Sequence, residues 1–216
     1  MERKFSITST LGGVMSFPPT RYRLITGAPF KLMQVQSLRI PDIKLLIPRR
    51  FTDDRGWFSE SYNQATMATA GFDLDFVQDN HSYSKPAGTV RGLHYQSPPF
   101  AQDKLVRVLR GRILDVAVDV RVGSPTYGDW LSAELTAGGG EQLLVPIGFL
   151  HGFITLEDDT EVAYKVTARY SADCDGNVRW DDPGLGIDWG ELADRAVLSE
   201  KDLRAPSWIE FESPFR

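Results

Sequence analysis

The sequence predicts an all-β fold, a sandwich or barrel of short strands with only a few short helices. Two observations predict it. From Gln34 onward, segments rich in β-branched and aromatic residues are short and are separated by turn residues. Helical patterns are weak, because only residues 64–70, stopped by Gly71, and the tail after Trp189 favour short helices. Many short strands with few helices are typical of sandwiches and barrels, which hold ligands in their mouths or interiors.

The clearest strand pattern lies in residues 105–109 and 113–120, and a hairpin turn is predicted between them at Arg110-Gly111. In the second of these strands apolar residues occupy one face, and the other face carries Asp115 and Asp119. Acidic residues on the second face predict that it meets either solvent or a polar cavity. Asp115 is the better candidate for lining a cavity.

The same pattern predicts further strands along the chain. They lie at residues 57–62, 75–80, 89–95, 130–136, 141–146, 151–156 and 160–168. Residues 1–32 differ, since they are rich in Ser, Thr, Gly and Pro and show no sustained periodicity. We expect residues 1–32 to be an N-terminal extension with at most partial order, and residues 33–216 to form the domain with its C-terminal tail.

Composition limits the classes of function. A chain of 216 residues forms one or at most two domains. Its formal net charge of -5 disfavours nucleic acid and anionic membranes as partners, so an anionic ligand needs a local basic cluster. Cys174 is the only cysteine, which excludes an intrachain disulfide and fits a reducing compartment. No apolar run approaches the roughly 20 residues that span a bilayer, and no secretory signal is evident, so we expect a cytoplasmic protein.

Two spaced motifs carry the candidate chemistry: Gly88-x5-His94-x-Gln96 and Gly140-x5-Pro146-x-Gly148-x2-His151. These spacings resemble the two motifs of the cupin jelly roll, a double-stranded β-helix, and the resemblance implies that both histidines point into the barrel. A metal-binding cupin has a second histidine where this chain has Gln96. Because transition-metal sites usually need three or more protein ligands, we expect no metal and histidines free for acid–base work.

A narrower resemblance covers about residues 34 to 206. It rests on the segments Phe51-Thr-Asp-Asp-Arg-Gly-Trp-Phe-Ser-Glu60, Gln78-Asp-Asn-His-Ser82, Arg91-Gly-Leu-His-Tyr-Gln96, Lys104-Leu-Val-Arg107, Pro146-x-Gly-Phe-x-His-Gly-Phe153 and Trp180-Asp-Asp-Pro183. The chain resembles the dTDP-4-dehydrorhamnose 3,5-epimerase family. The resemblance implies an isomerase without cofactor that converts dTDP-4-dehydro-6-deoxyglucose to dTDP-4-dehydro-L-rhamnose, and a homodimer whose N-terminal strand crosses to the partner's sheet.

Epimerisation beside a ketone requires a base, a group that stabilises the enolate oxygen, and an acid on the opposite face of the ring. His94 is the best candidate base, since an unperturbed imidazole pKa of about 6.5 suits neutral pH. Lys104 is expected to neutralise the enolate oxygen. The resemblance implies that Asp202 orients His94, that Tyr164 donates the proton, and that Tyr170 lies near the sugar.

The nucleotide diphosphate needs cations, and guanidinium groups grip phosphate oxygens in a fork. Arg55 and Arg91 are the best candidates. The resemblance implies that Glu60 contacts the thymine region, often from a neighbouring subunit. It also implies ligand contacts from Gln78, Asp79, Asn80, His151, Lys201 and Asp175, the last standing where relatives often carry Glu.

Several alternatives remain open on the sequence. A metal-dependent cupin such as an oxygenase is disfavoured by Gln96, and metal analysis would test it. A ketoisomerase, or a C3- or C5-monoepimerase of antibiotic deoxysugar biosynthesis, would be separated by product analysis. A non-catalytic cupin that binds a sugar nucleotide would behave alike with and without His94. The sequence leaves open whether C3, C5 or both carbons are inverted, and the identity of the nucleotide.

Overall fold

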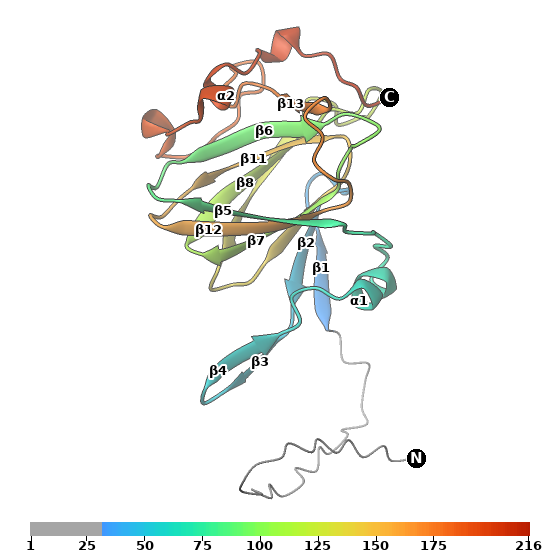
Figure 1. Cartoon of the computed structure of the whole chain (residues 1–216), viewed down its shortest axis with the longest axis vertical. Helices are drawn as coiled ribbons and strands as arrows, with labels where there is room; N and C mark the ends of the chain where they lie inside the picture. Colours follow the sequence, from blue (N-terminus) through green and yellow to red (C-terminus); the bar gives the residue numbers. More distant parts are fainter. Residues whose placement is uncertain (1–31) are drawn as a thin grey trace, which may run out of the picture. The chain divides into compact units, whose positions relative to one another are not determined.

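The structure is a computed structural model that describes residues 32–216 (Figure 1). The predicted extension, apart from its last residue, lies outside the described residues. Two antiparallel sheets face each other, which confirms the all-β prediction with few short helices. The first sheet has six strands in the order β1 (Met33–Ser37), β2 (Lys44–Pro48), β10 (Gln142–Val145), β7 (Lys104–Arg110), β12 (Thr160–Val166) and β5 (Gln78–Ser84).

The second sheet has five strands, and a separate hairpin has two. The five-stranded order is β13 (Asp175–Asn177), β6 (Val90–Gln96), β11 (Phe149–Thr155), β8 (Arg112–Asp119) and β9 (Trp130–Thr136). The hairpin pairs β3 (Arg50–Asp53) with β4 (Gly56–Ser59). Most predicted strands are confirmed within a few residues, but β5 begins three residues later than residue 75, and β2, β3 and β13 were not predicted.

The short helices also agree with the sequence. Helix α1 (Gln64–Thr69) begins after Asn63, whose side chain accepts a hydrogen bond from the backbone NH of Thr66. The tail contains α2 (Glu200–Leu203) and two 3₁₀ turns, η1 (Ala193–Arg195) and η2 (Trp208–Glu210). No helix in residues 32–216 is long and apolar enough to cross a membrane.

The predicted hairpin at Gly111 is wrong. Strand β7 pairs with β10 and β12, whereas β8 pairs with β11 and β9, so the chain passes from one sheet to the other at this residue. Gly111 has a φ of +77°, and a Cβ there would lie 2.4 Å from the hydroxyl oxygen of Thr160. The residue therefore makes a tight corner that a side chain would obstruct.

This corner leaves β8 buried on both faces. Its inner face packs between the sheets, where the core includes Ile113, Val106 and Phe149. Its outer face, with Val116, is covered by the C-terminal tail, which contributes Phe215. The acidic residues of β8 are consequently inside the molecule, and each needs a partner there.

The β3–β4 hairpin extends away from the two sheets (Figure 1). Near its tip, Phe58 is 69% exposed and Trp57 is 58% exposed. The guanidinium carbon of Arg50 lies 4.1 Å from the centre of the Trp57 ring, and its nitrogens donate to the carbonyls of Ala137 and Gly138. These contacts fix the base of the hairpin, while its tip leaves aromatic side chains uncovered.

Candidate active site

Two adjoining cavities of about 350 and 320 Å³ hold most of the predicted site residues. Both are lined by His94, Lys104 and Tyr164. The larger is also lined by Ser82, Thr89, Val90, Arg91, His151, Phe153, Val197, Leu198, Ser199 and Asp202. The smaller is also lined by Gln78, Asn80, Tyr95, Gln102, Tyr170, Asp175 and Lys201.

His94 is held by the carboxylate that the sequence predicted. The Nε2 atom of His94 lies 2.5 Å from Oδ1 of Asp202, which comes from α2 and is 4% exposed. The second oxygen, Oδ2, accepts a hydrogen bond of 2.8 Å from the hydroxyl of Ser199. With Nε2–H donating to Asp202, the other ring nitrogen carries the lone pair that can accept a proton.

The environment of Asp202 keeps this carboxyl ionised. Burial raises its pKa, but the hydrogen bond and charge of His94, the Ser199 hydroxyl and the nearby Lys201 ammonium outweigh burial and lower it. An ionised carboxylate at this distance can stabilise the positive charge of an imidazolium.

Lys104 lies on β7, in the sheet opposite His94. Burial lowers its pKa to about 8, and the charges of Asp115 and Asp175 oppose this effect. Its Nζ atom lies 3.4 Å from the backbone oxygen of His94. A buried ammonium at this position can stabilise a developing negative charge strongly, because the surroundings screen it little.

Tyr164 comes from β12 and lines both cavities, so it faces His94 from the opposite sheet. Burial raises the pKa of its hydroxyl, Asp175 adds to this effect and Arg91 opposes it. The hydroxyl therefore stays protonated at neutral pH, as a proton donor must.

A second histidine–aspartate pair lies beside the first. Nε2 of His151 is 2.8 Å from Oδ1 of Asp115, and β11 aligns His151 with His94 across the sheet. Asp115 is fully buried, and its Oδ2 has no hydrogen-bond partner among residues 32–216. The expectation that Asp115 faces a cavity rather than solvent is thus met in part: it stands behind His151, which forms part of the wall.

Two further groups of predicted residues lie in the same walls. Arg91 donates from Nε to the hydroxyl of Ser84 at 3.2 Å and from Nη2 to the backbone oxygen of Tyr83. At the other end, Asp175 accepts from Lys201 at 2.6 Å and from the Tyr170 hydroxyl at 3.2 Å.

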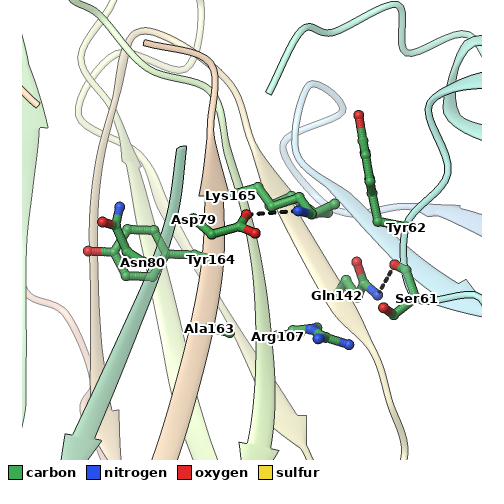
Figure 2. Close-up of a pocket in the computed structure, with 10 residues that line it drawn as sticks. Ser61, Tyr62, Asp79, Asn80, Arg107, Gln142, Ala163, Tyr164 and Lys165 are labelled. Atoms are coloured by element: carbon green, nitrogen blue, oxygen red, sulfur yellow. Dashed lines mark hydrogen bonds and ion pairs between the residues drawn. The ribbon is translucent and has the colours of Figure 1, made fainter. Parts of the chain in front are cut away.

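Gln78 and Asn80 line the smaller cavity, and the side-chain NH₂ of Gln78 donates a hydrogen bond of 2.8 Å to the side-chain oxygen of Asn80. Asp79 lies on the opposite face of β5, because side chains alternate along a strand. There its carboxylate pairs with Lys165 at 2.7 Å (Figure 2), beside a separate cavity of about 90 Å³. The structure does not bring Asp79 to His94.

The structure also keeps Arg55 and Glu60 away from these cavities. Arg55 lies at the tip of the β3–β4 hairpin, where its exposed guanidinium pairs with Asp53 at 2.6 Å. Glu60 accepts hydrogen bonds from the side chains of Asn63 and Thr66 near the start of α1. Neither residue lines the two cavities of this chain.

Gln96, at the position of a cupin metal ligand, is used structurally. Its side-chain NH₂ donates to the carbonyls of Phe100 and Arg169, and its oxygen accepts from the backbone NH of Ser171. Within residues 32–216, no three His, Cys, Asp or Glu side chains gather closely enough to hold a metal ion.

Sequence reasoning missed Ser199 and Phe153 as wall residues. Ser199 had a recognisable signal, since Ser-x-x-Asp before a short helix is a typical N-terminal cap, and its side chain accepts from the NH of Asp202. Phe153 ends one of the motif segments, but an aromatic residue on a buried strand is typical of the core, so its residue type did not predict a wall position.

Two facing sheets with a histidine–carboxylate pair in the cavity between them define a cupin-type enzyme built for proton transfer. A sequence profile of the family described as dTDP-4-dehydrorhamnose 3,5-epimerase matches residues 37–210. The chain belongs to the dTDP-4-dehydrorhamnose 3,5-epimerase family.

Individual relatives agree with this membership. The chain is 53% identical, over 190 residues, to dTDP-4-dehydrorhamnose 3,5-epimerase of Sinorhizobium fredii, covering 88% of this chain and 97% of the relative. The crystal structure of the Bacillus anthracis enzyme with TDP and PPi bound is 50% identical, with a TM-score of 0.77, covering 81% and 99% of the two chains. The Legionella pneumophila enzyme in complex with dTDP-4-keto-L-rhamnose is 38% identical, with a TM-score of 0.79, covering 85% and 98%.

Proposed function

We propose that this protein converts dTDP-4-dehydro-6-deoxyglucose to dTDP-4-dehydro-L-rhamnose by inverting C3 and C5. The family membership and the 53% identity to a 3,5-epimerase support this substrate. The observation that carries the proposal is the placement of His94 and Tyr164 on opposite sheets around one cavity, which Lys104 also lines. Inversion needs this arrangement of a base and an acid on two sides of the sugar.

The mechanism follows from the roles of these groups. His94 removes the proton from a carbon next to the C4 ketone, and the electron pair of the C–H bond forms an enolate whose oxygen is neutralised by Lys104. The Tyr164 hydroxyl then gives its proton to the opposite face of the same carbon. Solvent returns a proton to Tyr164 and accepts one from His94, and the same steps invert the second carbon.

The nucleotide is held by polar groups at the ends of the cavity. Arg91, whose guanidinium is oriented by Ser84, is proposed to bind the diphosphate. Gln78, Asn80 and His151 are proposed to contact the nucleotide. Tyr170, Asp175 and Lys201 are proposed to bind near the sugar, where their mutual hydrogen bonds already fix their positions.

We also infer a homodimer in which the β3–β4 hairpin reaches the partner's cavity. The exposed aromatic side chains near the tip of the hairpin and the exposed guanidinium of Arg55 support this arrangement. Aromatic and arginine side chains are typical anchors of protein interfaces. In such a dimer Arg55 binds the diphosphate and Glu60 the thymine region of the neighbouring site. We place the reaction in the cytoplasm, in keeping with a chain that has a single cysteine.

The proposal is tested by incubation with dTDP-4-dehydro-6-deoxyglucose in D₂O, followed by NMR of the product. Deuterium at C3 and C5 with inverted configuration is expected. Deuterium and inversion at one carbon would identify a monoepimerase instead. Binding of the substrate without any exchange would contradict the proton-transfer mechanism and favour a non-catalytic cupin.

A further inference from the structure

We propose that Ser199 is a positioning residue, whose hydroxyl fixes the carboxylate of Asp202 so that it orients His94. This inference rests on the proposed function, because it assigns Ser199 a part in the same proton transfer. The hydroxyl of Ser199 donates to Oδ2 of Asp202 at 2.8 Å, and the backbone NH of Asp202 donates back to the Ser199 hydroxyl at 3.2 Å. Each oxygen of the carboxylate therefore has one partner, since Oδ1 binds His94.

The location of Asp202 explains why it needs such a contact. Asp202 lies in α2, a helix of four residues, and so short a helix has little stability of its own. Its neighbour Leu203 is 62% exposed, and Glu200 is also exposed. Packing therefore fixes this turn of helix on one side only, and the carboxylate could rotate about its side-chain bonds without the Ser199 hydrogen bond.

The preceding residues place Ser199 firmly. The backbone NH of Val90 donates to the carbonyl of Val197 at 2.9 Å, and the NH of Val197 donates to the carbonyl of Gly88, also at 2.9 Å. These bonds join the segment to the start of β6, the strand that carries His94. Ser199 is thus fixed relative to the strand that carries His94. Its hydrogen bond then fixes the carboxylate of Asp202 relative to the same strand.

The second histidine–aspartate pair provides an internal comparison. Asp115 lies in the middle of β8, which is paired on both sides, and its free oxygen has no partner within the described residues. Asp115 is fully buried and bound by His151, so packing restricts its carboxylate, whereas the carboxylate of Asp202 lies on a four-residue helix and has a hydrogen-bond partner on each oxygen. Asp202 on the helix accordingly has a serine partner, and Asp115 on the strand has no such partner within the described residues.

The charged and titratable groups around this contact come from several elements. Burial raises the pKa of Asp202, and His94, Ser199 and Lys201 on α2 together lower it. Lys104 on β7, His151 on β11 and Arg91 on β6 share the cavity. The test therefore compares variants at one pH and changes only the hydroxyl.

The experiment measures kcat and KM of Ser199→Ala and Ser199→Thr. Loss of a hydrogen bond to a charged group predicts a kcat about tenfold lower in the alanine variant, with KM within about twofold of the native value. The threonine variant keeps the hydroxyl and should recover most of the activity. Ser207→Ala is the matched control, because Ser207 caps η2 through Glu210 and lies outside both cavities.

A double-mutant cycle separates positioning from a general structural effect. Because Ser199 acts through Asp202, Ser199→Ala should cause little further loss in an Asp202→Asn background. A full tenfold loss in both backgrounds, or a tenfold loss in the Ser207→Ala control, would overturn the inference. Equal kcat in the native and Ser199→Ala proteins would also overturn it.

A measurement without substrate keeps the inference separate from the proposed function. In proton NMR of the whole protein, the signal of the proton between His94 and Asp202 should shift or broaden in Ser199→Ala and return in Ser199→Thr. If the native protein exchanged no substrate proton, the proposed function would fail, while this signal would still decide the role of Ser199. An unchanged His94 signal in Ser199→Ala would contradict that role.

Discussion

His94 and Asp202 are 108 residues apart in the sequence, and their side chains are 2.5 Å apart in the structure. The histidine comes from a strand in the five-stranded sheet, and the carboxylate from a helical turn in the tail that covers this sheet. The tail therefore has two roles, since it buries the outer face of the sheet and brings a carboxylate to His94.

Tyr164→Phe should separate proton removal from inversion. The variant keeps His94 and Lys104, so exchange of a substrate proton with D₂O should persist, while formation of the inverted product falls about a hundredfold or more. NMR of the substrate and product in D₂O measures both rates. Tyr83→Phe is a suitable control, because Tyr83 is exposed and does not line either cavity. Equal loss of exchange and inversion in Tyr164→Phe would contradict its role as the acid.

The pKa of Lys104 predicts the alkaline limit of the reaction. Its pKa is lowered to about 8 by burial, so the ammonium is present below this pH and is lost above it. We expect kcat/KM to fall above about pH 8 as the enolate loses its cation. Lys104→Arg should keep the charge and move this limit to higher pH, at reduced overall activity.

Lys104→Met removes the cation at every pH and should leave little activity. Lys44→Met is the matched control, since Lys44 lies on β2 and its ammonium binds the hydroxyl of Ser37 outside the cavities. An alkaline limit that stayed in place in Lys104→Arg would show that another group causes it.

A dimer that shares its sites should allow two inactive variants to complement each other. His94→Ala removes the base, and Arg55→Ala removes the proposed contribution to the partner's site. Random mixing gives about half mixed dimers, each with one intact site, and so about a quarter of native activity. Refolding or co-expression followed by an activity assay measures this recovery. Mixtures no more active than the separate variants would show that Arg55 acts within its own chain or not at all.

Removal of metal ions should leave the activity unchanged. The proposed proton transfer by His94 and Tyr164, with Lys104 at the enolate oxygen, needs no Lewis acid. We expect full activity after dialysis against EDTA, and less than one metal ion per ten chains by elemental analysis. Loss of activity on chelation, restored by one particular divalent ion, would contradict the metal-free mechanism.

Asp119→Asn should lower stability without affecting catalysis. Asp119 is fully buried and accepts hydrogen bonds from Arg121, Ser124 and Thr126. Breaking such a buried pair costs about 3 kcal/mol of unfolding free energy. Thermal and denaturant unfolding measure the loss, and kcat at a temperature well below unfolding should match the native value.

Asp119 also predicts part of the acid sensitivity. Burial raises its pKa, but the contacts with Arg121, Ser124 and Thr126 outweigh burial and lower it to about 2. A carboxyl with a pKa below its usual value of about 3.9 contributes stability above that value. This contribution is lost as the pH falls from about 4 to 2. The native protein should thus lose stability over this range more steeply than Asp119→Asn.

Much of the fold could be predicted because alternation and turn residues are local signals. The corner at Gly111 could not, since the same turn residues serve a hairpin within a sheet and a passage between sheets. Strand β13 has only three residues, Asp175–Asn177, and is a strand only because it pairs with β6. A segment this short shows no strand pattern of its own when the partner strand lies far away in the sequence.

Placement in the cavities was predictable where a motif determined both residue type and spacing, as for His94, Lys104 and Tyr164. Asp79 was grouped with its neighbours Gln78 and Asn80, although alternation along β5 turns it to the opposite face. The Ser-x-x-Asp pattern predicts a helix cap at Ser199, but its place in the cavity wall follows only from the approach of α2 to His94. Motif resemblance gives residue types, whereas strand geometry decides which of them meet.

The C-terminal position of Asp202 has a consequence for protein synthesis. A ribosome completes β6 long before it reaches α2, so the nascent chain carries His94 without the carboxylate that contacts it in the folded protein. Products that stop before residue 202 also lack Phe215 and leave apolar side chains such as Val116 uncovered. Chains cut before residue 202 would therefore leave His94 without this partner and would tend to aggregate through the uncovered apolar surface.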